Sequence, residues 1–226
     1  QVYTTSIVVF SARNIEPDGS TATYVLKAST DAFTSTVFQA SGAITGFADV
    51  REPTVTINAG LIPNTSYYLR MHTSNYINLA SSSTEITVTT YTLPALPSAF
   101  SALVSSNVDI SSMSIKWGPN GNPLVPYTSY QIQVSSDINF GISTTSDTYL
   151  LSLDAASLLS NTSYYFRTRT LGVWWSTSGY NAVVATYTKV ASPGNKGFQV
   201  YTSSLTVFIA NAGNPDHSTA TYRVEV

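Results

Sequence analysis

The stretch that decides the fold is residues 61–70, LIPNTSYYLR, because a close copy, LLSNTSYYFR, stands at residues 158–167. Both copies contain Asn-Thr-Ser-Tyr-Tyr, with an arginine two residues after the second tyrosine. The copies lie 97 positions apart, which is the length of one small β-domain. An internal repeat of this length sets the unit in which the rest of the chain is interpreted.

A second repeat is about twice as long. Residues 1–4, QVYT, return as residues 199–202, which is 198 positions later, and further matches keep this spacing. Two kinds of domain are therefore expected to alternate along the chain. The predicted domains are residues 1–94, residues 95–193, and residues 194–226 as the N-terminal part of a third domain that repeats the first.

Composition and patterning favour β-structure. Charged residues make up 10% of the chain, against ~25% in typical soluble domains, and tyrosine occurs 15 times. Residues 130–134, YQIQV, alternate apolar and polar side chains as a half-buried strand does. Long stretches with helical periodicity are absent from the sequence. These features predict an all-β chain of tandem immunoglobulin-like β-sandwiches.

The repeated motif resembles the corner before the penultimate strand of fibronectin type III domains. In residues 61–70 it reads Leu-x-Pro-x-Thr-x-Tyr-x-x-Arg, and the second copy departs from it with Ser160 in place of the proline. The resemblance implies that Tyr67 and Tyr164 are structural corner tyrosines. Such a ring enters the core while its hydroxyl satisfies a backbone group a few residues upstream.

The same resemblance implies a set of core aromatic residues. Trp117 stands where the family packs a tryptophan from an early strand. Phe10 and Phe208 occupy that place in the other kind of domain, which departs from the family pattern. All three side chains are expected to be buried.

The residues give little support for catalysis. The chain has two histidines, His72 and His217, no cysteine, and none of the common nucleophile, zinc-protease or phosphate-loop motifs. We expect no enzyme activity, no cofactor and no metal; a calcium ion held at a domain junction is the one metal site left open. A net charge of −2 gives no reason to expect nucleic acid as a partner.

Two features are candidates for recognition or modification. Trp174 and Trp175 lie in the predicted loop between the last two strands of the second domain, where paired aromatics could contact a sugar or a protein. Alternatively, one caps its own core and the other packs on the next domain. Asn64 and Asn161 begin formal glycosylation sequons, although the turn chemistry of the corner explains both without a sugar.

These observations predict a non-catalytic structural or adhesive repeat region of an extracellular surface protein or filament. The alternatives are spacer modules of a secreted polysaccharide-degrading enzyme and a ligand-binding receptor ectodomain. Expected partners are neighbouring copies of the same domains, a cell-surface protein or a glycan, without direct membrane insertion. The third domain would be completed by its own chain or by strands of another chain.

Overall fold

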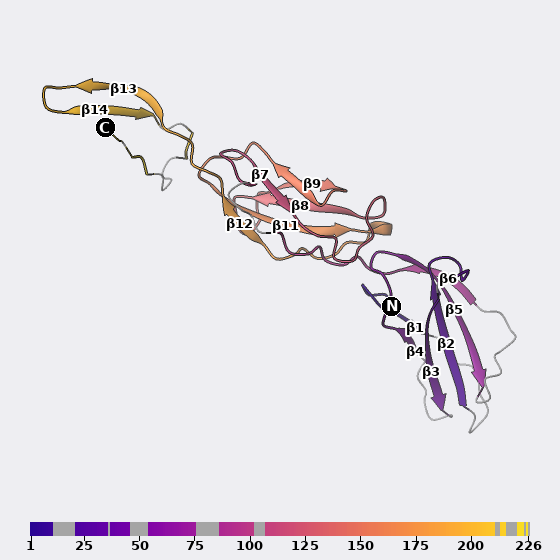
Figure 1. The fold of residues 1–226 in the computed structure, drawn as a ribbon. Coiled ribbons are helices and arrows are strands. Elements are labelled where there is room, and N and C mark those ends of the chain that lie inside the picture. The colour runs from indigo at the N-terminus through magenta and orange to yellow at the C-terminus, as the bar shows by residue number, and fades with distance from the viewer. Residues whose placement is uncertain are drawn as a thin grey trace. The chain divides into compact units, whose positions relative to one another are not determined.

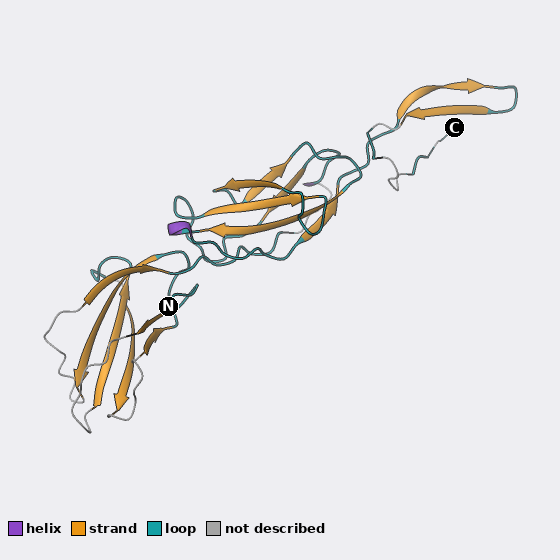
Figure 2. Cartoon of the chain, turned by 180° about the vertical axis from the view of Figure 1, so that it is seen from behind, coloured by secondary structure: helices purple, strands orange, loops and turns teal. Residues whose placement is uncertain are grey.

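The structure of the 226-residue chain is a computed structural model, which describes residues 1–10, 21–35, 37–45, 54–75, 86–101, 107–210, 213–215, 221–223 and 225. Strands account for nearly all of the regular structure in these residues (Figures 1 and 2). The expected all-β architecture is confirmed.

The first sandwich consists of a four-stranded antiparallel sheet and a two-stranded one (Figure 1). The larger sheet has the order β3-β2-β5-β6 and the smaller one pairs β1 with β4. Side chains that alternate along the strands, such as Val55 and Ile57, fill one core between the sheets. The bounds are β1 Ile7–Phe10, β2 Thr21–Ser29, β3 Phe38–Thr45, β4 Thr54–Ile57, β5 Ser66–Asn75 and β6 Ile86–Tyr91.

The second sandwich repeats this plan. Its four-stranded sheet has the order β12-β11-β8-β9, and β10 pairs with β7 in the smaller sheet. Burial alternates along the whole of β11, which packs Tyr164 and Phe166 into the core. The bounds are β7 Met113–Lys116, β8 Ser129–Ser135, β9 Thr144–Thr148, β10 Ser152–Ala155, β11 Ser163–Leu171 and β12 Val184–Tyr187.

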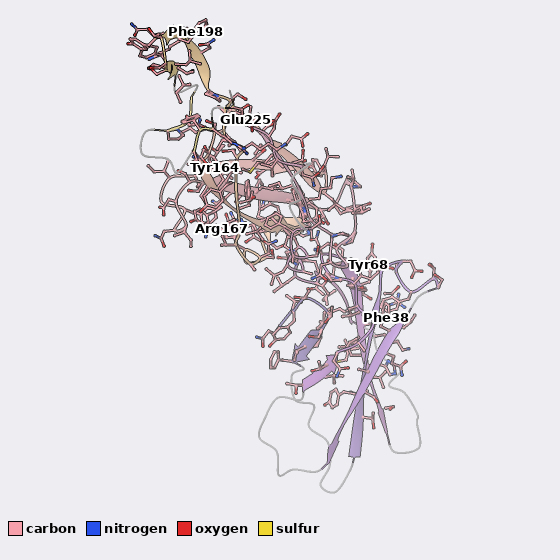
Figure 3. All side chains as sticks on the ribbon, turned by 60° about the vertical axis from the view of Figure 1, so that its left-hand side comes forward. Phe38, Tyr68, Tyr164, Arg167, Phe198 and Glu225 are labelled. Carbon is pink, nitrogen blue, oxygen red and sulfur yellow. The ribbon has the colours of Figure 1, made fainter. Side chains whose placement is uncertain are left out.

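The third repeat is described as one antiparallel hairpin of β13 (Gly194–Val200) and β14 (Leu205–Ala210). The equivalent segment of the first sandwich is similar, since Val2 bridges to Ile7 there as Val200 pairs with Leu205 here. Apolar side chains of the hairpin are exposed, including Phe198, which Figure 3 labels on this part of the chain.

The predicted core aromatics behave differently from one another. Trp117 is buried and makes edge-to-face contacts with Phe100 and Tyr130, with centroid distances of 6.3 and 5.8 Å. For Phe10 the prediction of a core position is wrong, because its side chain is 54% exposed. The residue that enters the core from β1 is Ile7, and an odd spacing of three residues turns Phe10 to the opposite face.

Phe208 is likewise not a core residue in the described part of the chain, since 47% of it is exposed. It lies at the position of Phe10 in the 198-residue repeat, and Leu205 lies at the position of Ile7. Leu205 is also 45% exposed, so neither face of β14 is buried in the described hairpin, and the register argument applies to Phe10 alone.

The chain divides into two compact units, in which two loops of the second sandwich group with the first sandwich. The first unit joins residues 1–96 to two loops of the second sandwich, residues 119–129 and 170–179. The second unit contains the remaining residues, 97–118, 130–169 and 180–226. The two loops belong with the first unit because side-chain hydrogen bonds tie them to it.

Candidate functional site

The corner tyrosines have the geometry that the sequence predicts. The Tyr67 hydroxyl accepts a hydrogen bond from the Ile62 backbone N–H at 2.7 Å, and the Tyr164 hydroxyl accepts one from Leu159 N–H at 2.9 Å. Burial raises the pKa of Tyr67 and this hydrogen bond partly offsets the increase. Each corner thus anchors the chain entering β5 or β11 through a ring in the core and a hydroxyl on the backbone.

A threonine directly after the next strand, β6 or β12, completes each corner. The Thr92 Oγ1 hydroxyl donates to the Ile62 carbonyl at 2.6 Å and accepts from Thr65 N–H at 3.1 Å. Thr188 repeats both bonds with Leu159 and Thr162, at 2.6 and 3.0 Å respectively, which are the equivalent positions. Sequence reasoning assigned no role to these threonines, although Thr-Tyr-Thr recurs at 90–92 and 186–188.

The corner arginine is the third repeated feature. The Arg70 guanidinium lies 4.3 Å from the Phe33 ring centroid, and Arg167 lies 4.1 Å from that of Phe140. Arg167, labelled in Figure 3, also lies 4.3 Å from the Tyr180 ring. Both arginines are therefore engaged within their own sandwich as structural cations.

Asn64 of the first corner holds the two loops of its compact unit. It is 1% exposed and has a left-handed backbone, φ 49°. Its Nδ2 donates to Thr128 Oγ1 at 2.8 Å and to the Tyr127 carbonyl at 3.0 Å, while its Oδ1 accepts from Val173 N–H at 2.8 Å. One buried amide thereby connects the loop of Tyr127 with the loop of the paired tryptophans.

The loop of the paired tryptophans is a tight turn after β11. A short 3-10 turn, Val173–Trp175, directly follows the C-terminal end of β11 (Figure 2). The Gly172 N–H donates to the Ser176 carbonyl at 2.7 Å, and Ser176 N–H donates back to the Val173 carbonyl at 3.1 Å. A Cβ atom on Gly172 would come within 2.4 Å of Asn64 Oδ1, so the close approach of Asn64 requires glycine there.

Both tryptophans are on the surface. Trp174 is 75% exposed and Trp175 is 98% exposed, so neither side chain is buried in a core. Both have left-handed backbones, with φ 54° and 62°. A left-handed non-glycine residue costs of order 1–3 kcal/mol and persists only where the surrounding structure imposes it. The hydrogen bonds of the loop supply that constraint.

The sequon asparagines are enclosed. Asn64 Nδ2 makes the two hydrogen bonds given above, and a glycan on that atom would replace one of its two hydrogens, so at least one of these bonds would be lost. Asn161, at the same corner position with φ 47°, also has a buried Nδ2, which finds no hydrogen-bond partner among the described residues. Attachment of a sugar to either nitrogen is incompatible with the corner as folded, so the turn chemistry is the better account of both sequons.

The histidines and acidic residues were the remaining candidates for a catalytic or metal site. His72 lies half-buried in β5, and His217 is outside the described residues. No group of three or more histidine or acidic side chains lies close enough to hold a metal in the part of the chain that the structure describes. Nor does any described helix have the length and apolar character needed to cross a bilayer.

Comparisons with known proteins rest on structure alone. No family model matches the chain, and no curated protein matches it in sequence. A segment of two fibronectin type III domains from chicken tenascin matches with a TM-score of 0.51 at 14% identity, covering 83% of this chain and 95% of that one. The fold is that of tandem fibronectin type III domains.

Two other solved structures with fibronectin type III domains are also similar. The FN1–FN3 domains of chicken CNTN1 match at 12% identity with a TM-score of 0.36, covering 83% of this chain and 64% of that one. A single domain of human fibronectin type III domain containing protein 3 matches at 21% identity with a TM-score of 0.36, covering 48% and 93% respectively.

Proposed function

We propose that the chain is a non-catalytic structural and adhesive repeat region of an extracellular surface protein or filament, in which fibronectin type III domains follow one another through fixed linkers. The observation that supports this proposal is a repeated clasp on the segment that enters a sandwich. It consists of an asparagine side chain that binds both backbone groups of one alanine.

The first clasp is made by Asn122, which is buried. Its Oδ1 accepts from Ala95 N–H at 2.8 Å and its Nδ2 donates to the Ala95 carbonyl at 2.9 Å. The Thr170 hydroxyl donates to the same carbonyl at 2.7 Å. Each backbone group of Ala95 thus has a side-chain partner, and the segment that leads into the second sandwich is held against the loop after β7.

The second clasp repeats the first. Asn214 Oδ1 accepts from Ala191 N–H at 2.9 Å and its Nδ2 donates to the Ala191 carbonyl at 3.1 Å. Both asparagines stand within Gly-Asn-Pro, at residues 121–123 and 213–215, and both glycines have positive φ, 82° and 92°. A device repeated at successive linkers favours an array in which each linker is held in one way, because side-chain clasps reduce the freedom of the joint.

The low charge suits the same role. Charged residues are 10% of the chain, and surfaces rich in serine, threonine and tyrosine hydrogen-bond to neighbouring copies without like-charge repulsion. The expected partners are therefore other copies of these domains, with a cell-surface protein or glycan as an adhesive target. An extracellular location follows from the same role.

Electron microscopy of the native material, with the complete gene in hand, tests the proposal. We expect fibres or surface arrays with a repeat that corresponds to successive sandwiches. A monodisperse globular monomer that turns over a small substrate would rule the proposal out. A catalytic domain beside two or three such repeats would instead identify them as spacer modules.

A further inference from the structure

We propose that Trp174 and Trp175 form a binding site for neutral polysaccharide, with the two indole rings as stacking surfaces for sugar rings. The proposal rests on the adhesive part of the proposed function and adds the chemical class of a ligand to it. Both side chains are free of the core, as their exposed fractions of 75% and 98% show.

The loop is held in place before any ligand arrives. Its backbone is closed by the hydrogen bonds between Gly172, Val173 and Ser176. It is also fixed by the hydrogen bond from Val173 N–H to the Asn64 side chain. Two consecutive non-glycine residues in the left-handed region are costly, so the loop maintains the tryptophans in a conformation that does not serve the core. A fixed loop loses little conformational freedom on binding, which favours affinity for a weakly contacting ligand.

A third aromatic residue lies on the partner loop. Tyr127 is exposed, and its backbone carbonyl accepts from the same Asn64 side chain that receives the Val173 N–H. The amide of one buried asparagine therefore ties the exposed tyrosine and the two exposed tryptophans to a common anchor. Several aromatic surfaces on tied loops fit a polymer with successive rings better than an isolated small molecule.

The absence of charged side chains from the two loops indicates a neutral ligand. Residues 119–129 and 170–179, the two loops of the unit, contain no lysine, arginine, aspartate or glutamate. Nucleic acid also stacks on aromatic rings, but it requires a cationic groove for its phosphates, which these loops do not supply. A neutral pyranose offers an apolar face of C–H groups to an indole and hydroxyls to the serine and threonine side chains beside it.

A protein partner is the competing occupant. Leu124 and Val125 are exposed on the Tyr127 loop and could extend an apolar contact to a second copy of the chain. The hydroxyl-rich and uncharged sequence from Ser176 to Gly179 beside the indoles favours sugar, because a protein hot spot is typically enclosed in a well-packed apolar surround.

The test is retention of the full chain on microcrystalline cellulose and on chitin beads, together with titration of cellohexaose and of the chitin hexasaccharide. The paired Trp174→Ala and Trp175→Ala changes are compared with the corresponding Phe changes and with Tyr149→Ala. Tyr149 is an exposed aromatic in the turn between β9 and β10 of the same sandwich, so it controls for loss of exposed aromatic surface.

We expect binding to at least one of the two polysaccharides and a blue shift of tryptophan emission with the matching oligosaccharide. The double alanine variant should bind at least roughly tenfold more weakly, the loss typical of truncating an aromatic anchor. The Phe variant should bind with intermediate strength, and Tyr149→Ala should bind like the natural chain. Melting temperatures of the variants should be nearly unchanged, because the altered side chains are exposed.

Absence of binding to both polysaccharides would overturn the proposal, as would equal binding by the double alanine variant. Self-association in sedimentation velocity that requires the tryptophans, without binding to sugar, would assign the surface to a second copy instead. If fibres or arrays are nonetheless seen in the native material, the structural role stands and only the glycan site is lost.

Discussion

Replacing Tyr164 by phenylalanine removes one hydrogen bond and hardly any volume, and Tyr130 provides a matched control in the same core. The Tyr164 hydroxyl accepts from Leu159 N–H at 2.9 Å. The Tyr130 hydroxyl is buried and finds no hydrogen-bond partner among the described residues, although the ring is packed against Trp117. Burial accordingly raises the pKa of Tyr130. The two substitutions are chemically the same and differ in whether a hydrogen bond is lost.

The expected free-energy changes have opposite tendencies. Tyr164→Phe leaves the Leu159 N–H without its partner, which costs roughly 1–3 kcal/mol, and the lower half of that range applies because the bond is only partly buried. Tyr130→Phe removes an unpaired polar atom from the core and should be neutral or stabilising by up to about 1 kcal/mol. The difference between the variants should therefore be about 1–3 kcal/mol.

Urea unfolding of the full chain, followed by tryptophan fluorescence, measures this difference. All three tryptophans lie in the second sandwich or its loops, and Trp117 in its core reports the unfolding of that sandwich. With a slope of roughly 1 kcal/mol/M for a small domain, Tyr164→Phe should lower the midpoint by about 1–3 M relative to Tyr130→Phe. Equal midpoints, or a larger loss from Tyr130→Phe, would refute the corner as a stabilising hydrogen bond.

Three further predictions follow from the described contacts. Asn122→Ala should lower the stability of the second sandwich by roughly 1–3 kcal/mol in the same urea assay, because it leaves the Ala95 N–H without its partner; an unchanged midpoint would mean that the clasp does not hold the linker. Acrylamide should quench the emission of Trp174 and Trp175 but spare Trp117, and full quenching of the native chain would contradict the buried position of Trp117. Asp137 accepts hydrogen bonds from two backbone N–H groups, which hold its pKa below the ordinary value of 3.8. A depressed folded pKa stabilises the fold above the unfolded value, and this contribution is lost as pH falls through the folded one. NMR titration of the Asp137 carboxyl should therefore give a midpoint below 3.8, and a midpoint at or above it would contradict the turn geometry.

Much of the fold was predictable because it depends on a local sequence motif that occurs twice in the chain. The corner of Tyr67 and Tyr164 combines turn residues, an inward ring and an upstream backbone donor within a few positions, so its repetition at domain spacing identified both the unit and its class. Sequence also pointed to Trp174 and Trp175, since two adjacent tryptophans between Gly172 and Gly179 stand out in any loop. These features depend on contacts near in sequence, and local pattern is enough to recognise them.

Other features depend on contacts that span the chain. The prediction that Phe10 is buried was wrong. Neighbouring residues of a strand point to opposite faces, and for the four-residue strand β1 only its pairing with β4 decides which face is buried. The sequence did not predict that Asn122 binds Ala95. Nor did it predict that Asn64 anchors the tryptophan loop through Val173, which lies 109 residues away. A side-chain amide has no periodic signature, so its partners are known only after folding has brought them together.

The sequence by itself thus determined the repeating unit, the all-β class and the corner that closes each sandwich, since these follow from spacing and local hydrogen bonding. The tertiary structure decided which face of β1 is buried, which asparagine holds which loop, and that both indoles of the pair remain in solvent. The physical reason is that burial belongs to the packed whole: a residue's exposure depends on what the rest of the chain places against it.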